Sequence, residues 1–143
     1  MGQTETYGAL AGRILLALIF VMSGINKIAT PEATQQYMAS HGMTTATGLL
    51  YAGAIAVEIG AGLALLLGYH TRRAGLLLAL FLVPTTLIFH TDFGDQNQFI
   101  HFLKNLAIMG GLLYVSVYGP GPMSVDAREQ ARQHSEAVEA GRG

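Results

Sequence analysis

Four apolar stretches, each about as long as a bilayer is thick, constrain the fold of this chain more than any other feature. They cover residues 8–28, 48–68, 73–90 and 98–118. At about 1.5 Å per residue, a helix of roughly 20 residues crosses the hydrocarbon core of a membrane. Because lipid cannot satisfy backbone N–H and C=O groups, each stretch is expected to be a transmembrane helix. The charged share of the chain, only 12%, also favours an integral membrane protein over a soluble one.

The connections between these stretches predict how the helices are arranged. The second and third connections are short, which favours antiparallel neighbours. In the longer first connection, Thr30 followed by Pro31 is typical of a helix start, and Gly42 of a helix end. A short interfacial helix is therefore expected over residues 31–41. We predict an all-α fold, an up-down four-helix bundle in the membrane that occupies residues 1–123.

The remaining residues, 124–143, form a polar tail rich in Ala, Glu, Gln and Arg. Ser124 or Asp126 is suited to cap a short helix in this tail. A partly disordered end is the alternative.

The distribution of Lys and Arg predicts the orientation. Arg72 and Arg73 flank the second connection and three more arginines lie in the tail, whereas the first and third connections have neither Lys nor Arg. By the positive-inside rule, both termini of this multi-pass protein are expected to be cytoplasmic.

Each expected span carries a single polar stripe on an otherwise apolar helix. At 100° per residue, the polar residues of one span fall on one face. If the four stripes face inward, the bundle has a polar interior shielded from lipid. The stripe residues that become candidates for a site are Arg13, Tyr51, Glu58, His90, His101, Lys104 and Asn105.

Glu58 is the most unusual of them, because it lies in the middle of the apolar residues 48–68. A charge at that depth costs roughly 2.5–3.5 kcal/mol and needs compensation. Lys104 from the outer side and Arg13 from the cytoplasmic side are the cationic candidates. Lys27, near the end of its span, is expected to snorkel or to cap the last carbonyls. The polar groups gather in the outer half, which predicts a cavity open to the periplasm; a purely structural pairing between helices is the alternative.

Several classes of site are disfavoured by the sequence. Cysteine is absent, which excludes disulfides, thiol chemistry and cysteine-ligated iron–sulfur clusters. The net charge of −1 and the lack of a basic patch give no indication of nucleic-acid binding. His90, Asp92, Asp95 and His101 do not have a recognised ligand spacing, so no metal site is predicted.

A stripe of small residues at i+4 spacing runs along the second span, from Ala52 to Gly68. Such stripes allow close helix approach. Packing within the bundle is one explanation, and the seam of a homo-oligomer is the other.

The order and spacing of the polar residues resemble the DoxX family of small bacterial membrane proteins with four spans. The matching pieces are Arg13 with residues 23–27, residues 58–68, and residues 104–111. The resemblance implies a four-helix, multi-pass protein of the bacterial inner (plasma) membrane. It also implies a link to quinone chemistry, because the family name comes from a subunit associated with a terminal quinol oxidase, and other members are tied to soluble redox partners. Carried over by resemblance, the functional core is Arg13, Glu58, Lys104 and Asn105.

Three functions follow as hypotheses. The first is a quinone- or redox-linked membrane subunit that binds a quinone or another lipid-like ligand in the bundle. Catalysis would then belong to a quinone-linked oxidoreductase of which the chain is an accessory subunit. The others are a non-enzymatic membrane anchor or scaffold for a soluble partner, and a small oligomeric proton-coupled transporter. In the first hypothesis the catalytic candidates are Glu58 and Lys104, and the ligand-binding candidates are Arg13, Tyr51, His90, His101 and Asn105.

Overall fold

The computed structural model describes residues 2–142, which form six helices and no strand. Four of the helices are long and apolar enough to cross a membrane. These are α1, α3, α4 and α5, and most of their large apolar side chains are exposed on the outside of the bundle, where lipid would contact them. The prediction of an all-α membrane bundle is confirmed. The helices are α1 (Gln3–Ala29), α2 (Pro31–Ser40), α3 (Thr47–Leu67), α4 (Thr71–Phe89), α5 (Gln96–Tyr118) and α6 (Val125–Ala140).

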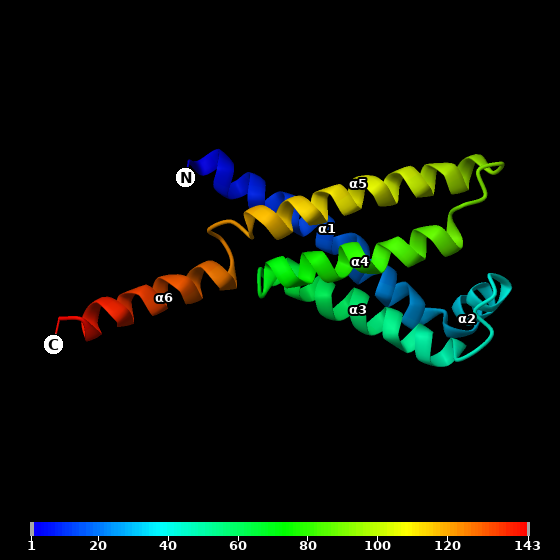
Figure 1. The fold of residues 1–143 in the computed structure, drawn as a ribbon, viewed down its shortest axis with the longest axis horizontal. Coiled ribbons are helices and arrows are strands. Elements are labelled where there is room, and N and C mark those ends of the chain that lie inside the picture. The colour runs from blue at the N-terminus through cyan, green and yellow to red at the C-terminus, as the bar shows by residue number, and fades with distance from the viewer. Residues whose placement is uncertain (1, 143) are drawn as a thin grey trace.

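The membrane helices form two antiparallel pairs (Figure 1). Helix α1 packs mainly against α3, and α4 packs mainly against α5, while the contact of α3 with α4 joins the pairs. The short α2 and the α4–α5 loop lie at one end of the bundle, called here the α2 end. The N-terminus, the α3–α4 turn and α6 lie at the other, called the α6 end (Figure 1).

Local sequence signals explain where several helices begin and end. Asp95 caps α5 by accepting a hydrogen bond from the Asn97 amide at 2.7 Å. Ser124 caps α6 in the same way, accepting from the Ala127 amide at 3.1 Å, so the helical alternative for the tail holds. Helix α3 ends at Gly68, whose φ of +71° favours glycine. The short helix expected after the first span is also present, as α2.

The half of the bundle nearer the α6 end is apolar and tightly packed. Leu65, Leu78 and Leu112 are fully buried there, together with several alanines. Glycines bring the helix pairs close, because a Cβ atom at Gly75 of α4 would lie 2.6 Å from the Ser116 hydroxyl of α5. The polar part of the interior therefore divides into two groups, one at each end of this apolar layer. The buried polar residues are Arg13, Glu58, Thr71, Thr86, Asn105 and Ser124.

The small-residue stripe of α3 does not serve packing within the bundle along most of its length. Ala52, Ala56 and Gly60 are exposed, and a Cβ atom at Gly60 would meet nothing within 4 Å. A different glycine, Gly62, allows the close approach of α1, since its Cβ atom would lie 3.0 Å from the side chain of Val21. Burial is set by which helix lies opposite, and the i+4 spacing alone does not identify that face.

Candidate functional site

A cavity of about 910 Å³ opens among α1–α5 at the α2 end of the bundle. Its volume is within the range of small-molecule sites, about 300–1,000 Å³. Most of the lining side chains are apolar, which suits a lipophilic ligand. The polar and ionisable lining residues are Ser23, Asn26, Lys27, Thr34, Tyr37, Glu58, Thr85, His90, His101, Lys104 and Asn105.

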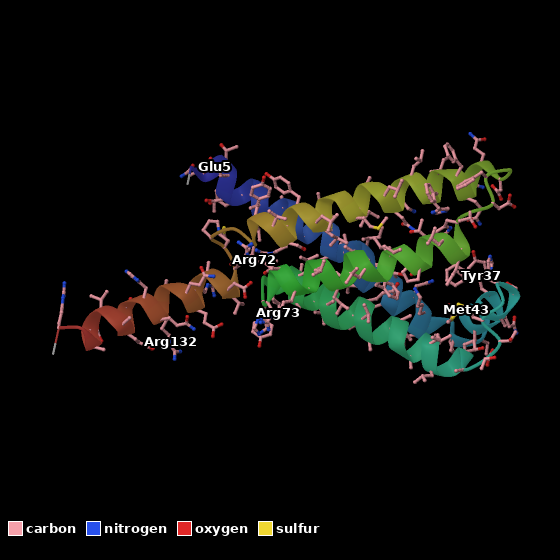
Figure 2. The ribbon with its side chains drawn as sticks, viewed as in Figure 1. Glu5, Tyr37, Met43, Arg72, Arg73 and Arg132 are labelled. Carbon is pink, nitrogen blue, oxygen red and sulfur yellow. The ribbon has the colours of Figure 1, made fainter. Side chains whose placement is uncertain are left out.

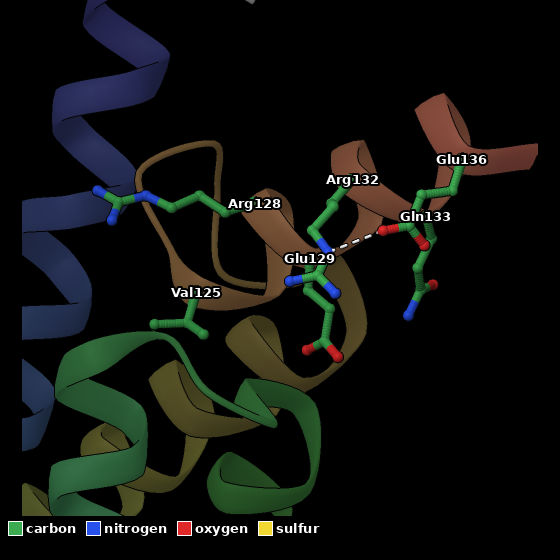
Figure 3. A pocket seen from close by; sticks show the side chains of 6 residues that line it. All are labelled: Val125, Arg128, Glu129, Arg132, Gln133 and Glu136. Atoms are coloured by element: carbon green, nitrogen blue, oxygen red, sulfur yellow. Dashed lines mark hydrogen bonds and ion pairs between the residues drawn. The ribbon is translucent and has the colours of Figure 1, made fainter. Parts of the chain in front are cut away.

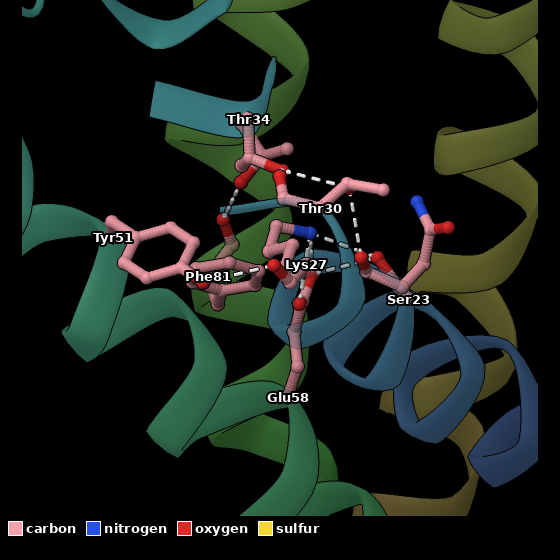
Figure 4. Close-up of polar contacts among 9 residues, drawn as sticks. Ser23, Lys27, Thr30, Thr34, Tyr51, Glu58 and Phe81 are labelled. Atoms are coloured by element: carbon pink, nitrogen blue, oxygen red, sulfur yellow. Dashed lines mark hydrogen bonds and ion pairs between the residues drawn. The ribbon is translucent and has the colours of Figure 1, made fainter. Parts of the chain in front are cut away.

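One wall of the cavity is built around an ion pair between α1 and α3 (Figure 4). The ammonium nitrogen of Lys27 lies 2.9 Å from each carboxylate oxygen of Glu58. Ser23, one turn before Lys27 on α1, accepts a hydrogen bond from Lys27 at 2.9 Å and donates one to Glu58 Oε1 at 3.1 Å. Gly24 brings the helices together here, because a Cβ atom at this position would lie 2.7 Å from Ile59. Lys27 and Ser23 therefore compensate the deep charge of Glu58.

This pairing corrects the sequence prediction. Neither Lys104 nor Arg13 is the ion-pair partner of Glu58, and Lys27 turns inward instead of snorkelling. Lys104 is excluded by the order of the helices, since α1 is the close neighbour of α3 and α5 is not. Arg13 is on α1 but lies too far along it, where its guanidinium binds backbone carbonyls at the α6 end. The i, i+4 spacing of Ser23 and Lys27 was the sequence signal that could have identified them.

The ion pair leaves one buried oxygen incompletely satisfied. Glu58 is 4% exposed, and its Oε2 atom has no aligned hydrogen bond from any described residue, although Lys27 lies within ion-pair distance. Tyr51, predicted as a ligand contact, donates a 2.8 Å hydrogen bond to the Lys27 carbonyl (Figure 4). Tyr51 does not line the cavity. It fixes the end of α1 that carries the lysine.

The opposite wall carries a buried polar pair between α4 and α5. Asn105, which is 7% exposed, donates a 3.0 Å hydrogen bond from its amide nitrogen to the Thr86 hydroxyl. The pair is the deepest polar feature of this wall, and it positions Asn105 on the cavity lining.

A basic cluster lies toward the end of the same wall. Lys104 Nζ is 2.8 Å from His101 Nδ1, one turn earlier on α5. The rings of His101 and His90 are stacked with their centroids 5.1 Å apart, and His90 Nδ1 lies 2.7 Å from Gln98 Oε1. The four predicted residues His90, His101, Lys104 and Asn105 thus come together on one side of the cavity, facing the wall that holds Glu58.

Arg13 lies at the other end of the molecule. Its guanidinium donates hydrogen bonds to the carbonyls of Pro120 at 2.6 Å and Met123 at 2.8 Å, with a longer one to Leu66 at 3.4 Å. Along α1 it is about 21 Å from Lys27. Arg13 therefore does not contact the cavity; it ties the α5–α6 connection to α1 and α3.

A second contact holds α6 to the bundle at the same end. Asp126 accepts hydrogen bonds from the backbone amides of His70 at 2.7 Å and Thr71 at 2.9 Å, and from the Thr71 hydroxyl at 2.8 Å. Burial alone would raise the pKa of Asp126, but the hydrogen bonds from Thr71 and His70 outweigh it and hold the pKa below its ordinary value. The carboxylate also sits at the N-terminus of α4, where the helix dipole favours negative charge.

Another hollow, of about 420 Å³, lies along the exposed surface of α6 (Figure 3). It is lined by alternating charges, including an exposed pair in which Arg132 Nε is 3.0 Å from Glu136 Oε1. Such a pair at i, i+4 is a solvated feature of the helix and contributes little. The two carboxylate and two guanidinium side chains balance one another, so the hollow favours neither charge. Within residues 2–142, no group of three His, Asp or Glu side chains is placed to hold a metal ion.

Comparison with known proteins agrees with this architecture. The family model described as DoxX matches residues 8–91, which is more than half of the chain. The inner membrane protein YqjF of Escherichia coli (strain K12) is 38% identical over 126 residues, covering 88% of this chain and 95% of that protein. The inner membrane protein YphA of the same organism is 33% identical over 126 residues, covering 83% of this chain and 88% of that protein. No solved structure matches the chain. The family match and the two inner-membrane relatives, together with four apolar helices, show that this chain is a bacterial inner-membrane protein of the DoxX family.

Proposed function

We propose that this protein binds a quinone in the cavity at the α2 end and acts as a membrane subunit in quinone-linked redox chemistry. The observation that carries the proposal is the composition of the cavity. Its walls are mostly apolar, and a few polar groups face one another across it, Glu58 with Lys27 on one side and Asn105 with Lys104 on the other. A quinone has the matching chemistry, because its ring and tail are apolar and its two oxygens accept hydrogen bonds.

The two walls of the cavity would supply different groups to the quinone. Lys104, Asn105 and His101 supply donors for a quinone oxygen from α5. Glu58 is the group able to exchange a proton with the bound ring, and its Oε2 atom has an open acceptor position. A bound quinone would supply the electron and proton transfer. We propose a soluble redox partner as the other end of the electron path, since the chain has no cysteine to hold an iron–sulfur cluster.

The proposed orientation places the cavity at the periplasmic side. Arg72, Arg73 and Arg132 lie at the α6 end, whereas Tyr37 and Met43 mark the α2 end, which carries the cavity (Figure 2). The positive-inside rule then puts the α6 end and both termini in the cytoplasm.

Ligand extraction and thermal unfolding test the proposal. Protein purified in mild detergent should yield a quinone on solvent extraction, and added decylubiquinone should raise its melting temperature by mass action. Ala54→Phe, which projects a ring into the cavity from α3, should weaken both effects. Ala56→Phe, on the exposed face of the same helix, is the matched control and should keep them. No extracted quinone and no thermal shift would refute the proposal.

One observation favours a second function, that of a membrane anchor for a soluble partner. Helix α6 projects from the bundle (Figure 1), and its first turn is held by the contacts of Asp126 with His70 and Thr71. A partner could therefore dock on a helix of fixed direction. A pull-down should compare the full chain with one that ends after Ala127, which keeps the Asp126 contacts. An unchanged set of partners would eliminate docking through α6.

The third hypothesis, proton-coupled transport, is less favoured by the packing. Leu65, Leu78 and Leu112 are fully buried between the cavity and the α6 end. An apolar layer of this kind closes the path that a solute would need. In proteoliposomes, a pH-driven flux that Glu58→Gln abolishes would restore the transport hypothesis.

A further inference from the structure

The charges that line the cavity do not cancel. Lys27 and Glu58 neutralise each other. Lys104 has no carboxylate within 4.0 Å among the described residues. Besides Lys27 with Glu58, the ion pair found in residues 2–142 is Arg132 with Glu136 on α6. The cavity lining therefore carries one uncompensated positive charge, on the wall formed by α5.

The nearest acidic residues along the chain are already engaged elsewhere. Asp92 and Asp95 lie in the turn before α5, where Asp92 accepts from the Gly94 amide at 3.1 Å and Asp95 from the Asn97 amide at 2.7 Å. Neither lines the cavity. Both carboxylates shape the turn, and neither lies within 4.0 Å of Lys104, which therefore has no ion-pair partner among the described residues.

His101 adds a second donor next to Lys104. The ammonium of Lys104 donates to His101 Nδ1 at 2.8 Å, so a neutral His101 carries its proton on Nε2. The stacked ring of His90 and its contact with Gln98 hold His101 in place from the α4 side. Two donors, one of them charged, thus lie at the rim of an apolar cavity.

We propose that Lys104 and His101 form a binding site for the anionic head of an amphiphile, with its acyl chain in the apolar part of the cavity. The shared head chemistry is a carboxylate or a phosphodiester, whose charged oxygens make stronger hydrogen bonds to an ammonium than neutral oxygens do. Leu49, Val57 and Ile88 are among the apolar side chains available to the acyl chain. This ligand class goes beyond the proposed quinone, because a neutral quinone leaves the charge of Lys104 uncompensated.

Native mass spectrometry of the full chain in detergent tests the site. The anionic probes are oleate and phosphatidylglycerol, and the neutral or zwitterionic counterparts are methyl oleate and phosphatidylcholine. We expect the anionic probes to bind about tenfold more tightly than their counterparts. Retention of oleate only would identify a free fatty acid as the ligand, retention of phosphatidylglycerol only a phospholipid, and retention of both a site that reads the charge alone. Equal binding of charged and neutral probes would overturn the proposal.

Variants of the charged residues test directly whether Lys104 causes the preference for anionic probes. Lys104→Gln should lower anionic binding to the level of the neutral probes, and Lys104→Arg should preserve it. Arg73→Gln removes an exposed charge at the α6 end and is the matched control, expected to change nothing. Glu58→Gln removes the negative charge from the cavity and should tighten anionic binding. Unchanged selectivity in Lys104→Gln would overturn the proposal, whatever the behaviour of the protein toward quinone.

Competition separates this inference from the quinone proposal. If both ligands use the cavity, oleate should displace decylubiquinone, and the Ala54→Phe variant should bind both less tightly. Selective oleate binding without any quinone binding would remove only the redox proposal. Quinone binding without charge selectivity would remove only the anionic site.

Discussion

Lys27 and Glu58 hold each other in place at a depth where either charge alone would be poorly solvated. Replacing one member of a buried pair leaves the other uncompensated, at a cost of roughly 3–5 kcal/mol, whereas replacing both by residues of similar size is often nearly neutral. We therefore expect Lys27→Met to destabilise the fold strongly. In the double variant with Glu58→Gln, most of that stability should return. Unfolding in mixed micelles, followed by circular dichroism, measures both differences.

Lys104 supplies the control for this prediction. It lines the same cavity but makes no ion pair with Glu58. Lys104→Met alone should cost little stability, and combining it with Glu58→Gln should restore nothing. A restoration by Lys104→Met, with none by Lys27→Met, would mean that Glu58 pairs with α5 in the membrane and would contradict the geometry described above.

These residues show what the sequence could and could not predict about the site. Helical periodicity placed Glu58, Lys104 and Asn105 on the polar faces of their helices, and the structure brings all three to one cavity. Periodicity describes one helix at a time, however, and the partner of Glu58 depends on which helix is its neighbour. Lys27 was missed for that reason, and Arg13, on the correct face of α1, binds backbone carbonyls that no pattern of side chains reveals.

At the scale of helices, the end of α3 depends on a single glycine. Gly68 has a φ of +71°, and an added Cβ atom there would clash with the Cβ atom of Ser124. Gly68→Ala should destabilise the protein by roughly 1–3 kcal/mol from the backbone conformation alone. The paired variant is Gly60→Ala on the same helix, where nothing lies within 4 Å and the higher helix propensity of alanine should add about 0.5–1 kcal/mol. In thermal unfolding, the melting temperature should therefore fall for Gly68→Ala and rise for Gly60→Ala. A destabilising Gly60→Ala would instead indicate that another molecule covers that face.

The attachment of α6 should depend on pH through Asp126. Because hydrogen bonds hold its folded pKa below the ordinary value, its stabilising effect is complete above the unfolded pKa of about 3.9. The effect is lost as the pH falls through the folded pKa. A dye on Ser135→Cys should report this as a drop in fluorescence anisotropy at acid pH, when α6 is released. In an Asp126→Asn background the anisotropy should be low already at neutral pH; a high, pH-independent value would show that Asp126 does not hold the helix.

The helices themselves were largely predictable. The four apolar stretches correspond to α1, α3, α4 and α5, whose ends differ from the expected spans by a few residues because caps and polar first turns extend them. Helix α2 followed from Pro31 and Gly42. For the tail, composition left helix and disorder open. The contacts of Ser124 and Asp126 favour the helix, and the partners of Asp126 in the α3–α4 turn are far away in sequence.

For the whole molecule, the sequence predicted an inward-facing polar stripe on each helix but not the division of the interior. Leu65, Leu78 and Leu112 are fully buried in the half of the bundle nearer the α6 end and help to separate the cavity from the polar contacts at that end. Sequence periodicity shows that a residue faces inward and says nothing of how far apart the facing helices are. The distance between facing helices determines both the wide cavity at the α2 end and the close packing toward the α6 end. The two ends of the molecule can consequently carry different roles, ligand binding at one and attachment of α6 at the other.

If the cavity and α6 lie on opposite sides of the membrane, cysteine labelling will show it directly, because the native chain has no cysteine. Thr45→Cys and Thr91→Cys are exposed positions in the loops of the α2 end, and Ser135→Cys is an exposed position on α6. With the cavity toward the periplasm, an impermeant maleimide should label the two loop variants in cells whose inner membrane is intact. Ser135→Cys should react only after that membrane is permeabilised. The reverse pattern would place the cavity on the cytoplasmic side, and any quinone or anionic lipid bound there would then meet cytoplasmic partners.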